Sequence, residues 1–107
     1  MSEVRIVLST INSLQKAEQI AEILVSERLA ACVNILPEVL SVYKWKDALE
    51  KDREVFMLIK TSSSRLEALT ERIQAIHPYE VPEIVHLDVV GGSRDYLDWV
   101  VAESKEL

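Results

Sequence analysis

The apolar residues of this chain recur at two spacings, and the order of these spacings along the chain is what most constrains its fold. Residues 3–9 carry apolar side chains at every second position, which predicts a strand. From Asn12 to about Leu29 they recur every three or four residues, which predicts a helix. Asn12 followed by Gln15 has the spacing of a capping box, so we expect the helix to begin there.

A long hairpin is expected next. Residues 31–46 predict a second strand, which Pro37 should bend or hold at an edge because proline cannot donate to a sheet ladder. We expect the chain to turn over residues 47–52. Residues 53–61 then predict the returning strand, and they are apolar at odd and even positions alike.

The second half of the chain predicts a helix, a strand and a last helix. Ser64 and Glu67 have capping-box spacing, and the helix that follows should end before Pro78. Residues 82–90 predict a fourth strand, and Ser93 should open a short final helix. The order βαββαβ with an added α predicts an α+β, ferredoxin-like split βαβ sandwich: a four-stranded antiparallel sheet with helices on one face.

This arrangement leaves one face of the sheet uncovered, yet the middle strands carry apolar residues on both faces. A monomer does not normally expose an apolar face of that size to water, so we expect further copies of the chain to cover it. Tyr43 and Trp45 lie on one side of their strand and are candidate interface residues.

Length and charge limit the class of protein. The 107 residues predict one domain, 1–107, and a composition of 49% hydrophobic and 28% charged residues is that of a globular chain. The net charge of −6 argues against nucleic acid as a partner. The chain has no apolar run long enough for a membrane span and only one cysteine, so we expect a cytoplasmic protein without disulfides.

Known catalytic signatures are missing from the sequence. It contains no GxGxxG, P-loop, GxSxG, HExxH or CxxC motif, so no catalytic residue is predicted and we do not expect an enzyme. Cys32 could form a nucleophile–base pair with a histidine in space, but no spacing favours this. Between Ala31 and Val33, Cys32 is expected to be a small buried packing residue.

The two histidines allow both structural and metal-binding interpretations. His77 stands at a helix end before Pro78, where it could serve as a cap or as a metal ligand. His86 alternates with apolar residues on a strand, so it is expected to face solvent or an interface, with metal ligation as the lesser alternative.

Four stretches of the sequence together are more specific than any single residue, and they cover nearly the whole chain. They are Ala30-Ala31-Cys32-Val33-Asn34; Tyr43-Lys44-Trp45-Lys46 with Glu50; Glu54 leading to Leu58-Ile59-Lys60-Thr61; and His77-Pro78-Tyr79-Glu80-Val81-Pro82-Glu83-Ile84 with Tyr96-Leu97-Asp98-Trp99 after it. In this order they resemble the CutA family of divalent-cation tolerance proteins.

The resemblance implies a ferredoxin-like subunit, a homotrimer similar to the PII signalling proteins, a cytoplasmic location and a link to copper and other divalent cations. Two departures limit what carries over. Asp47 stands where such hairpins commonly have glycine, and Ser9 and Ile76 stand where relatives proposed to bind copper have cysteine and a second histidine.

The sequence therefore predicts a trimeric, cytoplasmic divalent-cation binding or tolerance protein that requires no cofactor and has Cu²⁺ or another divalent cation as its expected ligand. His77 is the leading metal candidate, and the weaker candidates are Cys32, Glu80, Glu83 and His86. The rival hypothesis is a PII-like signalling or adaptor protein whose intersubunit clefts bind a small anion or a partner loop near Lys44, Lys60 and Tyr79.

Overall fold

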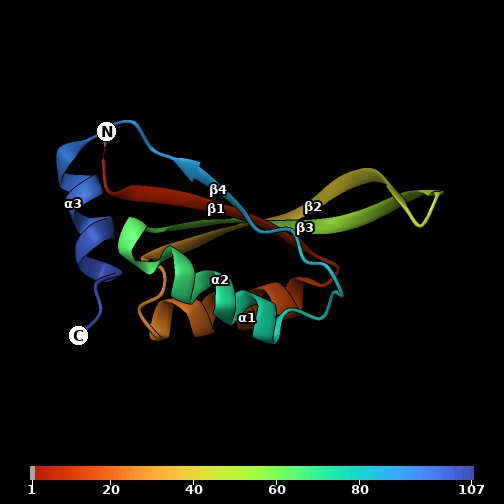
Figure 1. Ribbon diagram of the computed structural model, residues 1–107, viewed down its shortest axis with the longest axis horizontal. Coiled ribbons are helices and arrows are strands. Elements are labelled where there is room, and N and C mark those ends of the chain that lie inside the picture. The colour runs from red at the N-terminus through yellow and green to blue at the C-terminus, as the bar shows by residue number, and fades with distance from the viewer. Residues whose placement is uncertain (1) are drawn as a thin grey trace.

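The computed structural model describes residues 2–107 and contains the predicted order of elements. They are β1 (Val4–Ile11), α1 (Leu14–Ser26), β2 (Cys32–Trp45), β3 (Ala48–Ser62), a short 3₁₀ turn (Ser63–Arg65), α2 (Leu66–Ile76), β4 (Val85–Asp88) and α3 (Arg94–Glu103). The strands form one antiparallel sheet in the order β2-β3-β1-β4. Helices α1 and α2 pack side by side beneath it, and α3 stands at one end (Figure 1). The predicted α+β ferredoxin-like fold is confirmed.

The main core lies between the sheet and helices α1 and α2. Its fully buried apolar side chains are Val7 and Ile11 of β1, Ala17 and Leu24 of α1, Met57 and Ile59 of β3, and Leu69 and Ile73 of α2. Each large aliphatic side chain removed from water contributes about 1.5–3 kcal/mol, which is what holds the helices to this face. A smaller cluster of Val4, Ala31 and Val100 attaches α3 to the end of the sheet. No helix formed by residues 2–107 is both long and apolar enough to cross a bilayer.

The predicted helix starts were wrong in detail. Helix α1 begins at Leu14 because β1 continues to Ile11, and its cap is Ser13, whose Oγ accepts the Lys16 amide at 3.2 Å. The predicted Asn12 capping box is therefore not formed, and the helix ends at Ser26 rather than near Leu29.

The capping box predicted from Ser64 and Glu67 is also absent from the described structure. The 3₁₀ turn leads directly into α2, and the Ser64 hydroxyl lies 3.4 Å from the Ser62 hydroxyl instead of capping the helix. Helix α2 ends at Ile76, before Pro78, as predicted. Strand β4 is shorter than the predicted 82–90, because it pairs only with residues 5–8 of β1.

The hairpin turn is tighter than expected. Only Lys46 and Asp47 connect the strands, with φ values of 51° and 67°, as a two-residue type I′ loop requires, so residues 48–52 belong to β3 rather than to a loop. The expected irregularity at Pro37 is confirmed as a bulge between Leu36 and Val39. The arm formed by β2 and β3 extends well beyond the helices (Figure 1).

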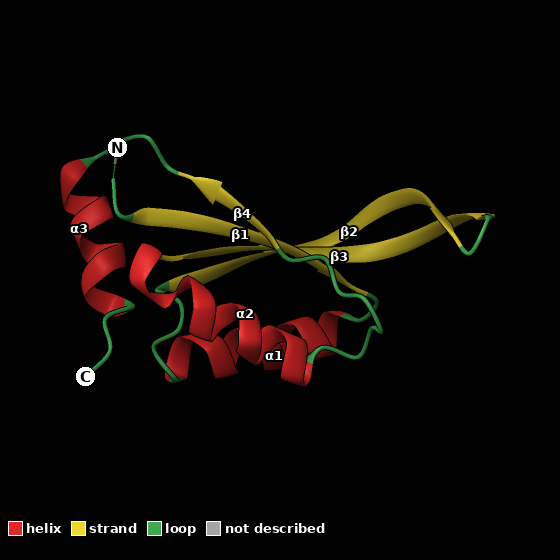
Figure 2. Cartoon of the chain, viewed as in Figure 1, coloured by secondary structure: helices red, strands yellow, loops and turns green. Residues whose placement is uncertain are grey.

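Helices α1 and α2 leave the opposite face of the sheet uncovered, and α3 packs only against one end of it (Figure 2). Strand register places a set of apolar side chains on this open face: Ile6, Leu8, Leu36, Phe56, Leu58, Val85 and Leu87. Leu36, Val85 and Leu87 each keep more than 40% of their surface exposed. The middle strands thus carry apolar side chains on both faces of the sheet, as predicted.

Candidate functional site

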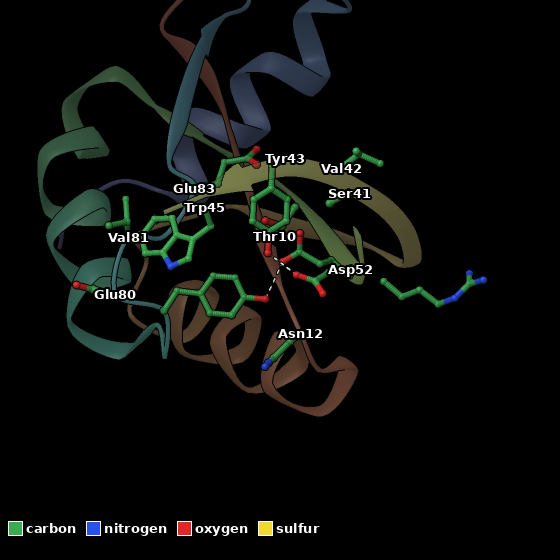
Figure 3. Close-up of a pocket in the computed structure, with 13 residues that line it drawn as sticks. Thr10, Asn12, Ser41, Val42, Tyr43, Trp45, Asp52, Glu80, Val81 and Glu83 are labelled. Carbon is green, nitrogen blue, oxygen red and sulfur yellow. Dashed lines mark hydrogen bonds between the residues drawn. The ribbon is translucent and has the colours of Figure 1, made fainter. Parts of the chain in front are cut away.

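A cleft of about 780 Å³ lies between the β2–β3 arm and the segment that joins α2 to β4 (Figure 3). Thirteen residues line it: Thr10, Asn12, Ser41, Val42, Tyr43, Trp45, Asp52, Arg53, Glu54, Tyr79, Glu80, Val81 and Glu83. Its walls thus combine aromatic rings with carboxylates. This combination makes it a candidate site.

The bulge in β2 determines which side chains reach this cleft. Before the bulge, even-numbered residues of β2 pair with the open-face residues of β3, as Leu36 does with Phe56. The extra residue shifts this alternation, so Ser41 and Tyr43 pair with Asp52 and Glu50 on that same face. Without the bulge, Tyr43 and Trp45 would point to the other side of the arm.

One hydrogen bond links the two walls of the cleft. The Tyr79 hydroxyl donates to Glu54 Oε2 at 2.7 Å, and Glu54 is only 7% exposed. Burial, followed by this hydrogen bond to the carboxylate, raises the pKa of Tyr79 well above its ordinary value. Tyr79 therefore stays a neutral donor and holds Glu54 in place.

A second tyrosine–carboxylate pair lies on the arm itself. The Tyr43 hydroxyl donates to Asp52 Oδ2, one strand across (Figure 3). That hydrogen bond, with burial and the nearby charges of Asp52, Glu54 and Glu50, raises the pKa of Tyr43 to about 12. Both tyrosines are thus uncharged at neutral pH, and the carboxylates set the charge of the cleft.

His77 is a structural residue in this fold. It is 7% exposed, its Nε2 lies 2.7 Å from the carbonyl oxygen of Thr10, and its Nδ1 accepts the Tyr79 amide at 3.1 Å. Accepting an amide at Nδ1 places the proton on Nε2, which then donates to the carbonyl. A metal ion could bind His77 only after one of these hydrogen bonds broke.

The weaker metal candidates are dispersed. His86 is exposed at the sheet edge, where its Nε2 lies 3.0 Å from Thr70 Oγ1 of α2. Glu80 and Glu83 line the cleft, whereas Cys32 lies elsewhere on the open face of the sheet. Residues 2–107 contain no group of three or more histidine, cysteine, aspartate or glutamate side chains placed to hold a metal ion.

Cys32 is less buried than predicted. Its exposure is intermediate, and its Sγ lies 3.8 Å from Asn34 Oδ1 and 3.8 Å from the Tyr96 hydroxyl. The prediction of a fully buried packing residue is therefore wrong for the single chain, because Cys32 lies on the open face of the sheet rather than on its helix-covered face.

The ligand cleft predicted near Lys44, Lys60 and Tyr79 lies between subunits and stays a prediction. Of these three residues, only Tyr79 lines the cleft within the single chain. Lys44 pairs with Leu49 on the far part of the arm, and the Lys60 ammonium lies 3.2 Å from the Tyr96 hydroxyl at the α3 end of the sheet. Two lysines expected to attract an anion are therefore outside the cleft.

The carboxylates of the cleft are what the sequence interpretation missed. The predicted turn 47–52 included Asp52, whereas Glu54 lay in the predicted strand 53–61. The spacing of two residues from Glu50 through Asp52 to Glu54 is the signal of one strand face. Tyr43 and Trp45, predicted on one side of their strand, both line the cleft. Their predicted role in a subunit interface remains a prediction.

The chain is similar to the same group of known proteins in sequence and in structure. Residues 5–103 match the family described as CutA1 divalent ion tolerance protein. The chain is 48% identical over 95 residues to a divalent-cation tolerance protein CutA of Thermus thermophilus, covering 89% of this chain and 92% of that one. It is 50% identical over 84 residues to the human protein CutA, but this match covers 78% of the chain and only 47% of the human protein.

Solved structures extend the similarity to the whole fold. The Thermus thermophilus divalent cation tolerance protein superimposes with a TM-score of 0.91 at 46% identity, covering 94% of this chain and 97% of that one. CutA from Xylella fastidiosa gives a TM-score of 0.94 at 40% identity and covers 97% of this chain and 100% of its own. The chain spans about half the length of the human and mouse relatives that it matches.

Proposed function

The chain belongs to the CutA1 family of divalent ion tolerance proteins, and from this premise we propose that it acts in the response to divalent metal ions as a homotrimer. The family is named for tolerance rather than for a reaction. In this proposal the protein works by binding metal ions and assembling with copies of itself. It carries out no catalytic step and requires no cofactor.

The open face of the sheet is the observation that supports assembly. Seven apolar side chains occupy it, and α1 and α2 lie on the other side of the sheet (Figure 2). Packing this face against other copies would remove it from water at a gain of roughly 25 cal/mol per Å². The resemblance to the family supplies the number of copies, three, arranged around a common axis.

A substitution at the centre of the open face tests this assembly. Leu58 pairs with Leu8 and Asn34 there, so Leu58→Asp would bury a charge in the proposed interface and should shift the protein toward monomers. Val25→Asp, on the exposed side of α1, is the matched control and should keep the wild-type mass. Equal masses for both variants in light scattering would remove the open face from the interface.

We place the divalent-cation contact of this proposal at His86, with Cu²⁺ as the favoured ion. His86 is exposed, and its Nδ1 has no hydrogen-bond partner among residues 2–107, whereas both nitrogens of His77 are engaged. Copper stands highest in the affinity order of divalent ions for imidazole. A single imidazole provides fewer ligands than a tight site requires, so binding to one subunit should be weak.

Calorimetric titration with Cu²⁺ distinguishes the two histidines. His86→Ala should weaken binding at least several-fold, and His77→Ala should leave the affinity unchanged while lowering stability. Loss of binding in His77→Ala alone would return the site to His77. A cytoplasmic location, which a lone free thiol suits, remains part of the proposal and is tested by cell fractionation.

The cleft supports a second candidate function, that of a PII-like adaptor that binds a small ligand. Its volume of about 780 Å³ lies in the range of small-molecule sites. The lysines expected to attract an anion lie outside it, so the chemistry of its lining has to decide which ligand it suits.

A further inference from the structure

We propose that the cleft beside the β2–β3 arm binds an aliphatic polyamine, held by carboxylates on two walls and by aromatic rings between them. This inference goes beyond metal tolerance. It rests on the proposed assembly leaving this cleft open, but it does not depend on where copper binds, so a protein that forms a trimer and fails to bind the polyamine would overturn this inference alone.

The charges that line the cleft favour a cation. Asp52 and Glu54 of β3 form one wall, and Glu80 and Glu83 of the segment after α2 contribute to the other. Arg53 is the one basic side chain among the lining residues, and its guanidinium is paired at 3.1 Å with a carboxylate outside the lining. An anionic ligand would meet four carboxylates there, whereas an ammonium group would be attracted by them.

Glu54 offers a specific acceptor. The side chain is almost fully buried, and Tyr79 occupies only its Oε2 atom. Its Oε1 atom accepts no hydrogen bond from residues 2–107 and can accept one from a ligand. An ammonium donor would make a charge-assisted hydrogen bond, which is about twice as strong as a neutral one.

The aromatic residues suit the rest of such a ligand. Tyr43, Trp45 and Tyr79 line the cleft, and ring faces attract ammonium groups and pack against methylene chains. The chain itself provides an example, because the Lys46 ammonium lies 5.7 Å from the centroid of the Trp45 ring. An alkylammonium group is thus already accommodated against one ring of this site.

The spacing of the carboxylates argues for an extended cation rather than a metal ion. Asp52 and Glu80 come from opposite walls (Figure 3), and within the described chain no three potential ligands converge on a point. A metal ion needs its oxygen ligands within about 2.0–2.6 Å of one centre. A polyamine carries its charges several bonds apart and can reach both walls at once.

The test is a calorimetric titration of the assembled protein with spermidine at low ionic strength. Glu54→Gln keeps an acceptor for Tyr79 but removes the charge, and it should raise the Kd about tenfold or more. Glu18→Gln removes the same charge from an exposed position on α1, outside the cleft, and should leave the Kd unchanged. Equal effects of both variants would show general charge attraction and overturn the proposal.

A second variant separates the aromatic contribution from that of charge. Trp45→Leu changes no charge at a side chain that is 42% exposed, so it should fold. Because Trp45 is also an interface candidate, the variant is compared with wild type at equal mass in light scattering, and there its affinity for spermidine should be several-fold weaker. A diol of matching chain length should not bind. Wild-type affinity in Trp45→Leu, equal binding of the diol, or no spermidine binding at millimolar concentration would each overturn the proposal.

Discussion

Ser9 and Ser104 are both fully buried serines, but only one of their hydroxyls has a partner. Ser104 Oγ donates to the Val100 carbonyl at 2.7 Å and lies 3.1 Å from Ser62 Oγ. Ser9 Oγ has no hydrogen-bond partner among residues 2–107. Burying an unpaired hydroxyl costs about 1–3 kcal/mol. Ser9, which stands where relatives were expected to carry cysteine, therefore lowers the stability of this chain.

Replacing each serine by alanine should change stability in opposite directions. Ser9→Ala removes an unpaired hydroxyl and should raise the free energy of unfolding by about 1 kcal/mol. Ser104→Ala removes a satisfied hydroxyl and should lower it by about 1 kcal/mol. Urea unfolding at one fixed protein concentration measures both, and destabilisation by Ser9→Ala would mean that its hydroxyl has a partner in the assembled protein.

The raised pKa of Tyr43 predicts how the stability of the arm changes at alkaline pH. Its pKa is raised from 10.0 to about 12 by the hydrogen bond to Asp52, so folding favours the protonated hydroxyl. The resulting stability is fully present below pH 10 and is lost as the pH rises from 10 through about 12. Because Tyr43 is partly exposed, the effect should be small.

Tyr43→Phe cannot ionise and provides the comparison for this prediction. Wild type should lose more stability than Tyr43→Phe between pH 10 and 12, and tyrosinate absorbance should show one group fewer titrating in the variant. Identical pH profiles would show that the Tyr43–Asp52 hydrogen bond does not persist in solution.

At the scale of elements, the sequence predicted which side chains of a strand share a face, because burial of apolar residues determines this. Met57 and Ile59 must face the helices and Phe56 and Leu58 the other side, and their alternation indicated this. The hairpin turn was missed because neither of its two residues is glycine or asparagine. Lys46 and Asp47 adopt positive φ angles, which side-chain sterics disfavour, so local preference pointed to a longer turn.

Asp47→Gly should therefore stabilise the arm. Asp47 has φ of 67°, a conformation that costs a residue with a β-carbon about 1 kcal/mol more than glycine, so unfolding should require about 1 kcal/mol more. Asp52→Gly, in the paired part of β3, should instead be destabilising. Thermal unfolding of the two variants checks the prediction, and a lower midpoint for Asp47→Gly would contradict it.

At the scale of the whole molecule, the cleft could not be derived from sequence. Its defining contact joins Glu54 and Tyr79, which are 25 residues apart, and a bulge of one residue decides that Tyr43 faces them. Each feature depends on the register of strands rather than on any local pattern. The order of the apolar patterns predicted the fold, and the resemblance of four stretches to a family predicted the class of protein. Hydrogen bonds seen only in the fold show that His77 is engaged.

The mass of the wild-type protein in solution tests the central claim most directly. In the proposed trimer, the two other copies of the chain cover the open sheet face of each subunit. Sedimentation equilibrium at micromolar concentration should therefore give about three times the 12.2 kDa mass of one chain. A mass of one or two chains that does not change with concentration would contradict the account.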